Sequence, residues 1–64
     1  MPISGKKMLK RYLKEGWFIL RRSSSHVQVS KLRSDGKRMN ETIPMHKELK
    51  KGLECKLLKR LKED

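Results

Sequence analysis

The chain has 64 residues, with 18 Lys and Arg against 7 Asp and Glu, and a formal net charge of +11. A chain this short buries only about 60% of its unfolded surface, so we expect a single domain over residues 1–64. The positive charge favours RNA, DNA or an acidic protein as partner. The longest apolar run, Trp17–Leu20, is far shorter than the ~20 residues of a membrane-spanning helix, which excludes a membrane span.

The number and spacing of cysteines, histidines and carboxylates exclude disulfide-linked and metal-binding classes of protein. Cys55 is the single cysteine, so no internal disulfide can form. No basic-then-apolar leader begins the chain, and the expected location is the cytoplasm. The sequence has no Cys/His cluster, no pair of carboxylates beside apolar residues and no glycine-rich phosphate loop. We therefore expect neither a metal nor a cofactor.

The first predicted element is a helix over residues 5–15. Ser4 is a suitable N-cap, because its hydroxyl can accept a bond from an amide of the first turn. Gly16 ends the helix, since glycine readily adopts the left-handed conformation there. Basic residues occupy most of the other positions of the helix, and four residues form one apolar stripe at helical spacing: Met8, Leu9, Tyr12 and Leu13.

Three strands are predicted next. Residues 17–22 are apolar and aromatic enough for the first, and three serines turn the chain into a second, where Val27 and Val29 alternate with polar residues. Asp35-Gly36 predicts another turn, followed by a third strand over residues 39–44. Pro44 suits an edge strand.

A polar link over residues 45–52 leads to a second helix, whose apolar stripe comprises Leu53, Leu57, Leu58 and Leu61. Two amphipathic helices and one antiparallel meander are most simply combined by packing both helices on one face of the sheet. This α+β arrangement is that of the double-stranded-RNA-binding domain. Alternation then directs Val27 and Val29 to the helices, and His26, Gln28 and Ser30 to the open face.

His26 is the candidate catalytic residue, because an imidazole on an open face can exchange a proton near neutral pH. Surface histidines usually have no such role, and His46, in the polar link, has a similarly ordinary explanation. Among the aromatics, Tyr12 and Trp17 are expected in the core, whereas Phe18 is compatible with either core or surface. Since residues 17–20 are apolar on both faces, one face of this strand is a candidate protein contact.

Basic residues on the predicted sheet are candidates for RNA phosphates. A run of charge is more often only a solvated turn, but few acidic residues neutralise this one. The candidates are Arg21, Arg22, Lys31, Arg33, Lys37 and Arg38.

Several short segments, in order and covering nearly the whole chain, resemble the HicA family of bacterial toxins. They are Ser4-Gly5-Lys6, Gly16-Trp17, Ser25-His26 after Arg21-Arg22, Thr42-Ile43-Pro44 with His46, and Lys47-Glu48-Leu49-Lys50-Lys51-Gly52 before a leucine-rich helix. No single segment is specific, and their collinearity carries the resemblance. Ser24 stands where the family usually has glycine, and Leu53 stands where threonine usually follows the Lys-Lys-Gly glycine.

The resemblance implies a metal-independent mRNA interferase with the fold described above, inhibited by a HicB-type antitoxin. It also implies that His26 is the catalytic histidine, acting as a general base. The general acid is left open between His26 itself in a stepwise cycle, a lysine and solvent. Two alternatives stay open from the residues alone: a non-catalytic RNA-binding module, and a small protein that only holds an acidic partner.

Overall fold

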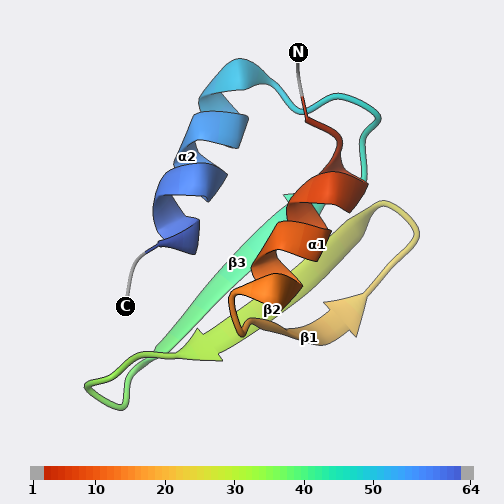
Figure 1. Ribbon diagram of the computed structural model, residues 1–64. Helices are drawn as coiled ribbons and strands as arrows, with labels where there is room; N and C mark the ends of the chain where they lie inside the picture. Colours follow the sequence, from red (N-terminus) through yellow and green to blue (C-terminus); the bar gives the residue numbers. More distant parts are fainter. Residues whose placement is uncertain (1–2, 63–64) are drawn as a thin grey trace.

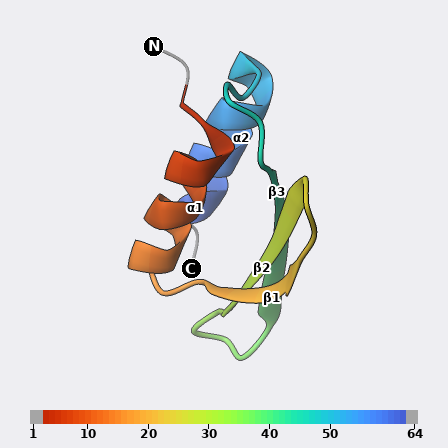
Figure 2. The same ribbon diagram turned by 90° about the vertical axis from the view of Figure 1, so that its right-hand side faces the viewer.

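The architecture is a helix, a three-stranded antiparallel sheet and a second helix, as the sequence predicts. The computed structural model describes residues 3–62, with α1 at Gly5–Lys14, β1 at Phe18–Arg22, β2 at His26–Leu32, β3 at Arg38–Pro44 and α2 at Lys51–Leu61 (Figure 1). The strands follow the order β1-β2-β3, with β2 in the centre. Both helices cover one face of the sheet and leave the other face open, which confirms the double-stranded-RNA-binding-domain arrangement (Figure 2).

Local signals account for the two ends of α1. The Lys7 amide donates to the hydroxyl oxygen of Ser4 over 3.1 Å, which is the predicted N-cap. After the helix, Gly16 has a φ of +96°, a conformation that favours glycine. The next residue, Trp17, is buried, and its ring lies edge-on to Tyr12 with 4.8 Å between ring centroids. Trp17 therefore belongs to the core, as expected, but β1 begins one residue later than predicted.

The core lies between the sheet and the two helices. Val27 and Val29 are buried there, and the Tyr12 hydroxyl donates to the Leu57 carbonyl over 2.6 Å, which joins α1 to α2. Other buried apolar residues come from both helices, from β3 and from the connecting segments: Met8, Leu9, Trp17, Met39, Ile43, Leu49 and Leu61. Leu49 lies in the link that the sequence suggests is polar. Within residues 3–62, neither helix is long and apolar enough to cross a bilayer.

Ser30 lies on the predicted face of the sheet but is not exposed there. Strand pairing places Ser30 on the open face opposite Phe18 and Asn40, yet Ser30 is fully buried and its hydroxyl donates to the Met39 carbonyl over 3.0 Å. A short side chain in the central strand lies below the surface formed by longer neighbours on both sides. His26 and Gln28, expected on the same face, are exposed.

The second helix begins at Lys51, two residues before the first leucine of its stripe. Its N-cap residue, Lys50, makes no side-chain capping bond. Packing holds the helix instead: Leu57 and Leu61 are buried, and Glu41 of β3 lies 3.9 Å from Lys56 Nζ and 3.8 Å from Arg60 Nε.

Candidate active site at one end of the sheet

His26 is the first residue of β2 and is exposed, at the end of the sheet where the β1–β2 turn lies. Ser23 fixes its backbone from both sides. The Ser23 hydroxyl donates to the His26 carbonyl over 3.0 Å and accepts from the His26 amide over 3.1 Å, and the Ser23 amide donates to the same carbonyl over 2.8 Å. Ser23 thus holds the backbone of His26 in a closed turn.

The imidazole of His26 is also oriented. Its Nδ1 lies 2.9 Å from the hydroxyl oxygen of Ser25, within hydrogen-bond distance. No further hydrogen bond to this ring is found among residues 3–62, so Nε2 is available to a substrate. A histidine with one nitrogen held and the other accessible is suited to proton transfer.

The structure brings a second histidine to the same place. Pro44 pairs with His26 across β2 and β3, and the rings of His26 and His46 lie with their centroids 6.5 Å apart at an angle of 67°. Sequence reasoning did not bring these histidines together. The signal was nevertheless present, because His26 and Pro44 are equally far along the chain from Asp35 in the predicted turn.

Arg21 and Arg22 lie near the same end of the sheet. Arg21 pairs with Gln28, which places it on the open face with His26, whereas Arg22 pairs with Val27 and so alternates to the helix side. Both arginines are exposed, and neither belongs to an ion pair found within the described part of the chain. Of the predicted RNA-binding residues, Arg21 is therefore the one that shares both the end and the face of His26.

The other predicted RNA-binding residues lie elsewhere. Arg33, Lys37 and Arg38 belong to the β2–β3 hairpin, at the opposite end of β2 from His26 (Figure 1). At a strand rise of about 3.3 Å per residue, the length of β2 separates this hairpin from His26 by about 20 Å. Arg33 also lies 3.6 Å from Asp35, and Lys31 alternates to the helix side of the sheet. The structure does not bring these four cations to His26.

The open side of the sheet also carries exposed apolar side chains. Phe18, Leu20 and Leu32 are 42%, 47% and 58% exposed, and we call these three residues the apolar patch. Leu20 occupies a bulge in β1, where the pairing register shifts between Ile19 and Arg21. The Arg38 guanidinium lies 6.0 Å from the centre of the Phe18 ring. The prediction that the apolar run beginning at Trp17 exposes one face is thus confirmed for Phe18 and Leu20.

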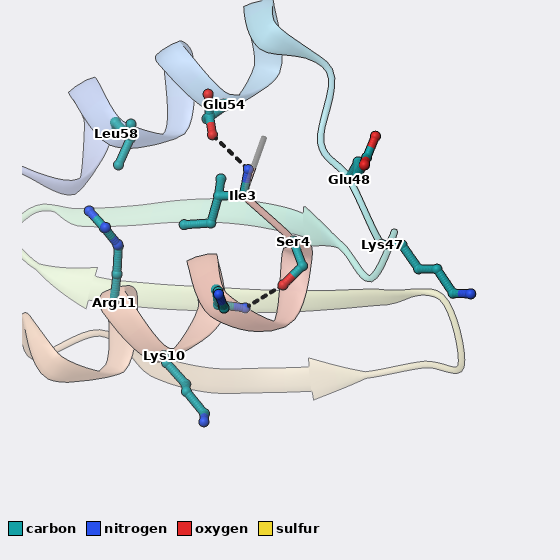
Figure 3. Close-up of a pocket in the computed structure, with 9 residues that line it drawn as sticks. Ile3, Ser4, Lys10, Arg11, Lys47, Glu48, Glu54 and Leu58 are labelled. Atoms are coloured by element: carbon teal, nitrogen blue, oxygen red, sulfur yellow. Dashed lines mark hydrogen bonds between the residues drawn. The ribbon is translucent and has the colours of Figure 1, made fainter. Parts of the chain in front are cut away.

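A groove of about 570 Å³ lies on the helix side, between α1, α2 and the link that follows β3 (Figure 3). Ile3 and Ser4 form part of its wall, and the Ile3 amide donates to the Glu54 carboxylate over 2.9 Å. Its basic residues are Lys7, Lys10, Arg11 and Lys47. His26 does not line this groove, so the candidate active site is the exposed end of the sheet and not a closed pocket.

Metal ligands are not gathered at this end of the sheet. Among residues 3–62 no group of three or more His, Cys, Asp or Glu side chains is placed to hold a metal ion. The groups that the site offers are two imidazoles, serine hydroxyls and arginine.

Fold and site together define a small, strongly basic α+β protein of the double-stranded-RNA-binding-domain type, with an exposed histidine pair at one end of its sheet. Residues 5–62 match the family model described as HicA toxin of bacterial toxin-antitoxin, and the chain belongs to this family. Comparison with curated proteins and with solved structures gives no match.

The serine at position 24 fits this turn without the glycine that is usual in the family. Only Gly16 and Gly36 have positive φ among residues 3–62, so the β1–β2 turn requires no left-handed residue.

Proposed function

We propose that this toxin is an endoribonuclease that cleaves mRNA in the cytoplasm, with His26 as general base and without a metal ion. The observation that supports it best is the exposed His26 ring, with Nδ1 held 2.9 Å from Ser25 Oγ on the open face of a protein of net charge +11. The charge concentrates RNA, and the free nitrogen accepts a proton from it.

The reaction is a transfer within the RNA. His26 removes the proton of a ribose 2′-OH, and the 2′-oxygen forms a bond to the adjacent phosphorus. The bond from phosphorus to the 5′-oxygen of the next nucleotide then breaks, and that oxygen takes up a proton. The products carry a 2′,3′-cyclic phosphate and a 5′-hydroxyl, and no metal-activated water is needed for the attack.

Positive side chains stabilise the charge that develops on the phosphate in the transition state. We assign this role to Arg21, because it shares the open face and the end of the sheet with His26. The remaining predicted RNA-binding residues contact phosphates farther along the bound strand or on its flanks: Arg22, Lys31, Arg33, Lys37 and Arg38.

A HicB-type antitoxin is the proposed inhibitor. Charge alone gives fast encounter but little selectivity, so a specific inhibitor also needs a buried apolar anchor. Phe18 and Leu20 are half-exposed on the sheet, in the strand that leads to the β1–β2 turn and His26. An antitoxin seated on the apolar patch would cover the open face and keep RNA from His26.

The deciding experiment compares His26→Ala with the wild-type protein in cleavage of a long mRNA in buffer containing EDTA. Loss of a general base typically lowers the rate by about 10² to 10⁴, so we expect His26→Ala to be almost inactive. Because the ring is exposed, the free energy of unfolding should change by no more than about 0.5 kcal/mol, and RNA affinity should change little. Wild-type cleavage should persist in EDTA.

Asn40→Ala is the matched control, because Asn40 is also exposed on the open face of the sheet, near its other end. It should cleave at close to the wild-type rate. Equal cleavage by folded His26→Ala would contradict the assignment of His26 as the base. Absence of cleavage by the wild-type protein would favour a non-catalytic RNA-binding module, whereas loss of wild-type activity in EDTA would contradict only metal independence.

A further inference from the structure

His46 occupies a defined position beside the candidate base. Its ring centroid lies 6.5 Å from that of His26, and the residue is exposed. At this separation both rings can contact a single phosphodiester group. The ring of His46 makes no hydrogen bond found among residues 3–62, so its nitrogens are available to a bound substrate.

The backbone around His46 is held from two directions. The Gly5 amide, at the start of α1, donates to the His46 carbonyl over 2.9 Å, and the Met45 amide donates to the Ser25 carbonyl over 2.8 Å. The first bond ties the link to α1, and the second ties it to the turn that carries His26. The backbone positions from which the two imidazoles project are therefore set relative to each other by hydrogen bonds that join three segments.

We propose that His46 is the general acid of the reaction, the group that protonates the leaving 5′-oxygen. This inference rests on the proposed function. In the forward step His26 takes the proton from the 2′-OH, the O2′–P bond forms, the P–O5′ bond breaks, and the imidazolium of His46 gives its proton to O5′. The cycle is restored when His26 loses a proton to solvent and His46 gains one.

Two imidazoles suit these opposite roles, because histidine is the side chain that exists in both proton-donor and proton-acceptor forms near neutral pH. No carboxylate is found hydrogen-bonded or ion-paired to either ring among the described residues. The two histidines are thus the groups at this end of the sheet that are suited to exchange protons with the substrate.

The test uses a leaving group that needs no acid. A short RNA is made with sulfur in place of the 5′-bridging oxygen at a cleavage site mapped on ordinary RNA. Thiols have pKa values of about 8.5, so a thiolate leaves without prior protonation, unlike an alkoxide. Wild type, His46→Ala, His46→Gln and His26→Ala are compared on both substrates, with thermal melting and RNA affinity measured for each variant.

We expect both His46 variants to cleave ordinary RNA about 10² to 10⁴ times more slowly than wild type, and to cleave the sulfur substrate at close to the wild-type rate. His26→Ala should be slow on both substrates. A purely structural role for His46 would slow both substrates equally, and this result, or unchanged cleavage of ordinary RNA by the His46 variants, would overturn the inference. Failure of His26→Ala to slow either substrate would instead overturn the proposed base, and failure of wild type to cleave would overturn both.

Discussion

At the scale of single residues, Gly5 contributes to the position of His46 relative to His26. A side-chain carbon built at Gly5 would overlap the carbonyl oxygen of Pro44, so the start of α1 packs directly on the end of β3. The same close approach allows the Gly5 amide to reach the His46 carbonyl. Glycine is required here for space and not for an unusual φ, because its φ is not positive.

Gly5→Ala is therefore expected to lower the free energy of unfolding by about 1–3 kcal/mol, the usual cost of forcing extra atoms into a packed site. Urea denaturation measures the change. Gly52→Ala is the matched control, because Gly52 lies in α2 with nothing within 4 Å of an added carbon. That substitution should stabilise the protein by about 0.4–1 kcal/mol, since alanine restricts the unfolded chain. Effects of the same sign at both positions would contradict the packing argument.

At the scale of elements, the long β2–β3 pairing separates two groups of candidate RNA-contacting residues. One end of the sheet carries His26, His46 and Arg21, and the other end carries the basic β2–β3 hairpin. Under the proposed function, an RNA strand bound along the open face would contact both ends, but only the end that carries His26 would reach the scissile phosphate. The hairpin cations are accordingly expected to contribute to affinity and not to the chemical step.

The double variant Lys37→Ala/Arg38→Ala is expected to bind single-stranded RNA more weakly, with a shallower salt dependence. Each lost phosphate contact reduces the slope of log K against log salt by about 0.7. The cleavage rate at saturating RNA should stay unchanged, because these residues lie about 20 Å from His26 along a strand. Lys59→Ala, an exposed cation of α2 on the helix side, is the control and should leave the slope unaltered. A fall in the saturated rate as large as that of His26→Ala would refute the division of roles.

At the scale of the whole molecule, the fold produces two unlike surfaces. The helix side buries the core and carries three lysines and one arginine around a groove, whereas the open side combines the apolar patch with the histidine pair. Exposed apolar residues on a small, highly charged protein are typical of a protein contact. A toxin whose apolar patch and candidate active site share one face can be inhibited by a single partner.

We therefore expect RNA and the antitoxin to compete for the open face. Leu20→Asp should weaken antitoxin binding by at least about 30-fold, which corresponds to about 2 kcal/mol or more for a central interface residue. Leu13→Asp is the control, because Leu13 is exposed to a similar extent, 41% against 47%, but lies on α1. Calorimetric titration with the proposed HicB-type antitoxin measures both affinities. A stable ternary complex in which RNA is cleaved at the free rate would show that inhibition acts from elsewhere.

Most of the fold could be predicted because its signals are local. Ser4 caps α1, Gly16 ends it, and the alternation of Val27 and Val29 identifies the buried face of β2. Each signal acts within one or two turns of helix or a few residues of strand, through hydrogen bonds and steric limits that neighbours in the chain impose. The exposure of His26 could be predicted in the same way, because inward and outward side chains alternate along β2.

Only the tertiary structure decided which chemical groups meet. His46 reaches His26 because β2 and β3 pair in one register and because Gly5 lets α1 pack on Pro44, which are contacts between residues far apart in the sequence. The β2–β3 register also places the basic hairpin at the far end of the sheet from His26. It sets Ser30 between longer side chains of the neighbouring strands, where it is buried. Residue types and their local order therefore determined the helices, the strands and the candidate base His26. Strand register and close packing, which depend on the whole folded chain, determined that His46 lies beside it.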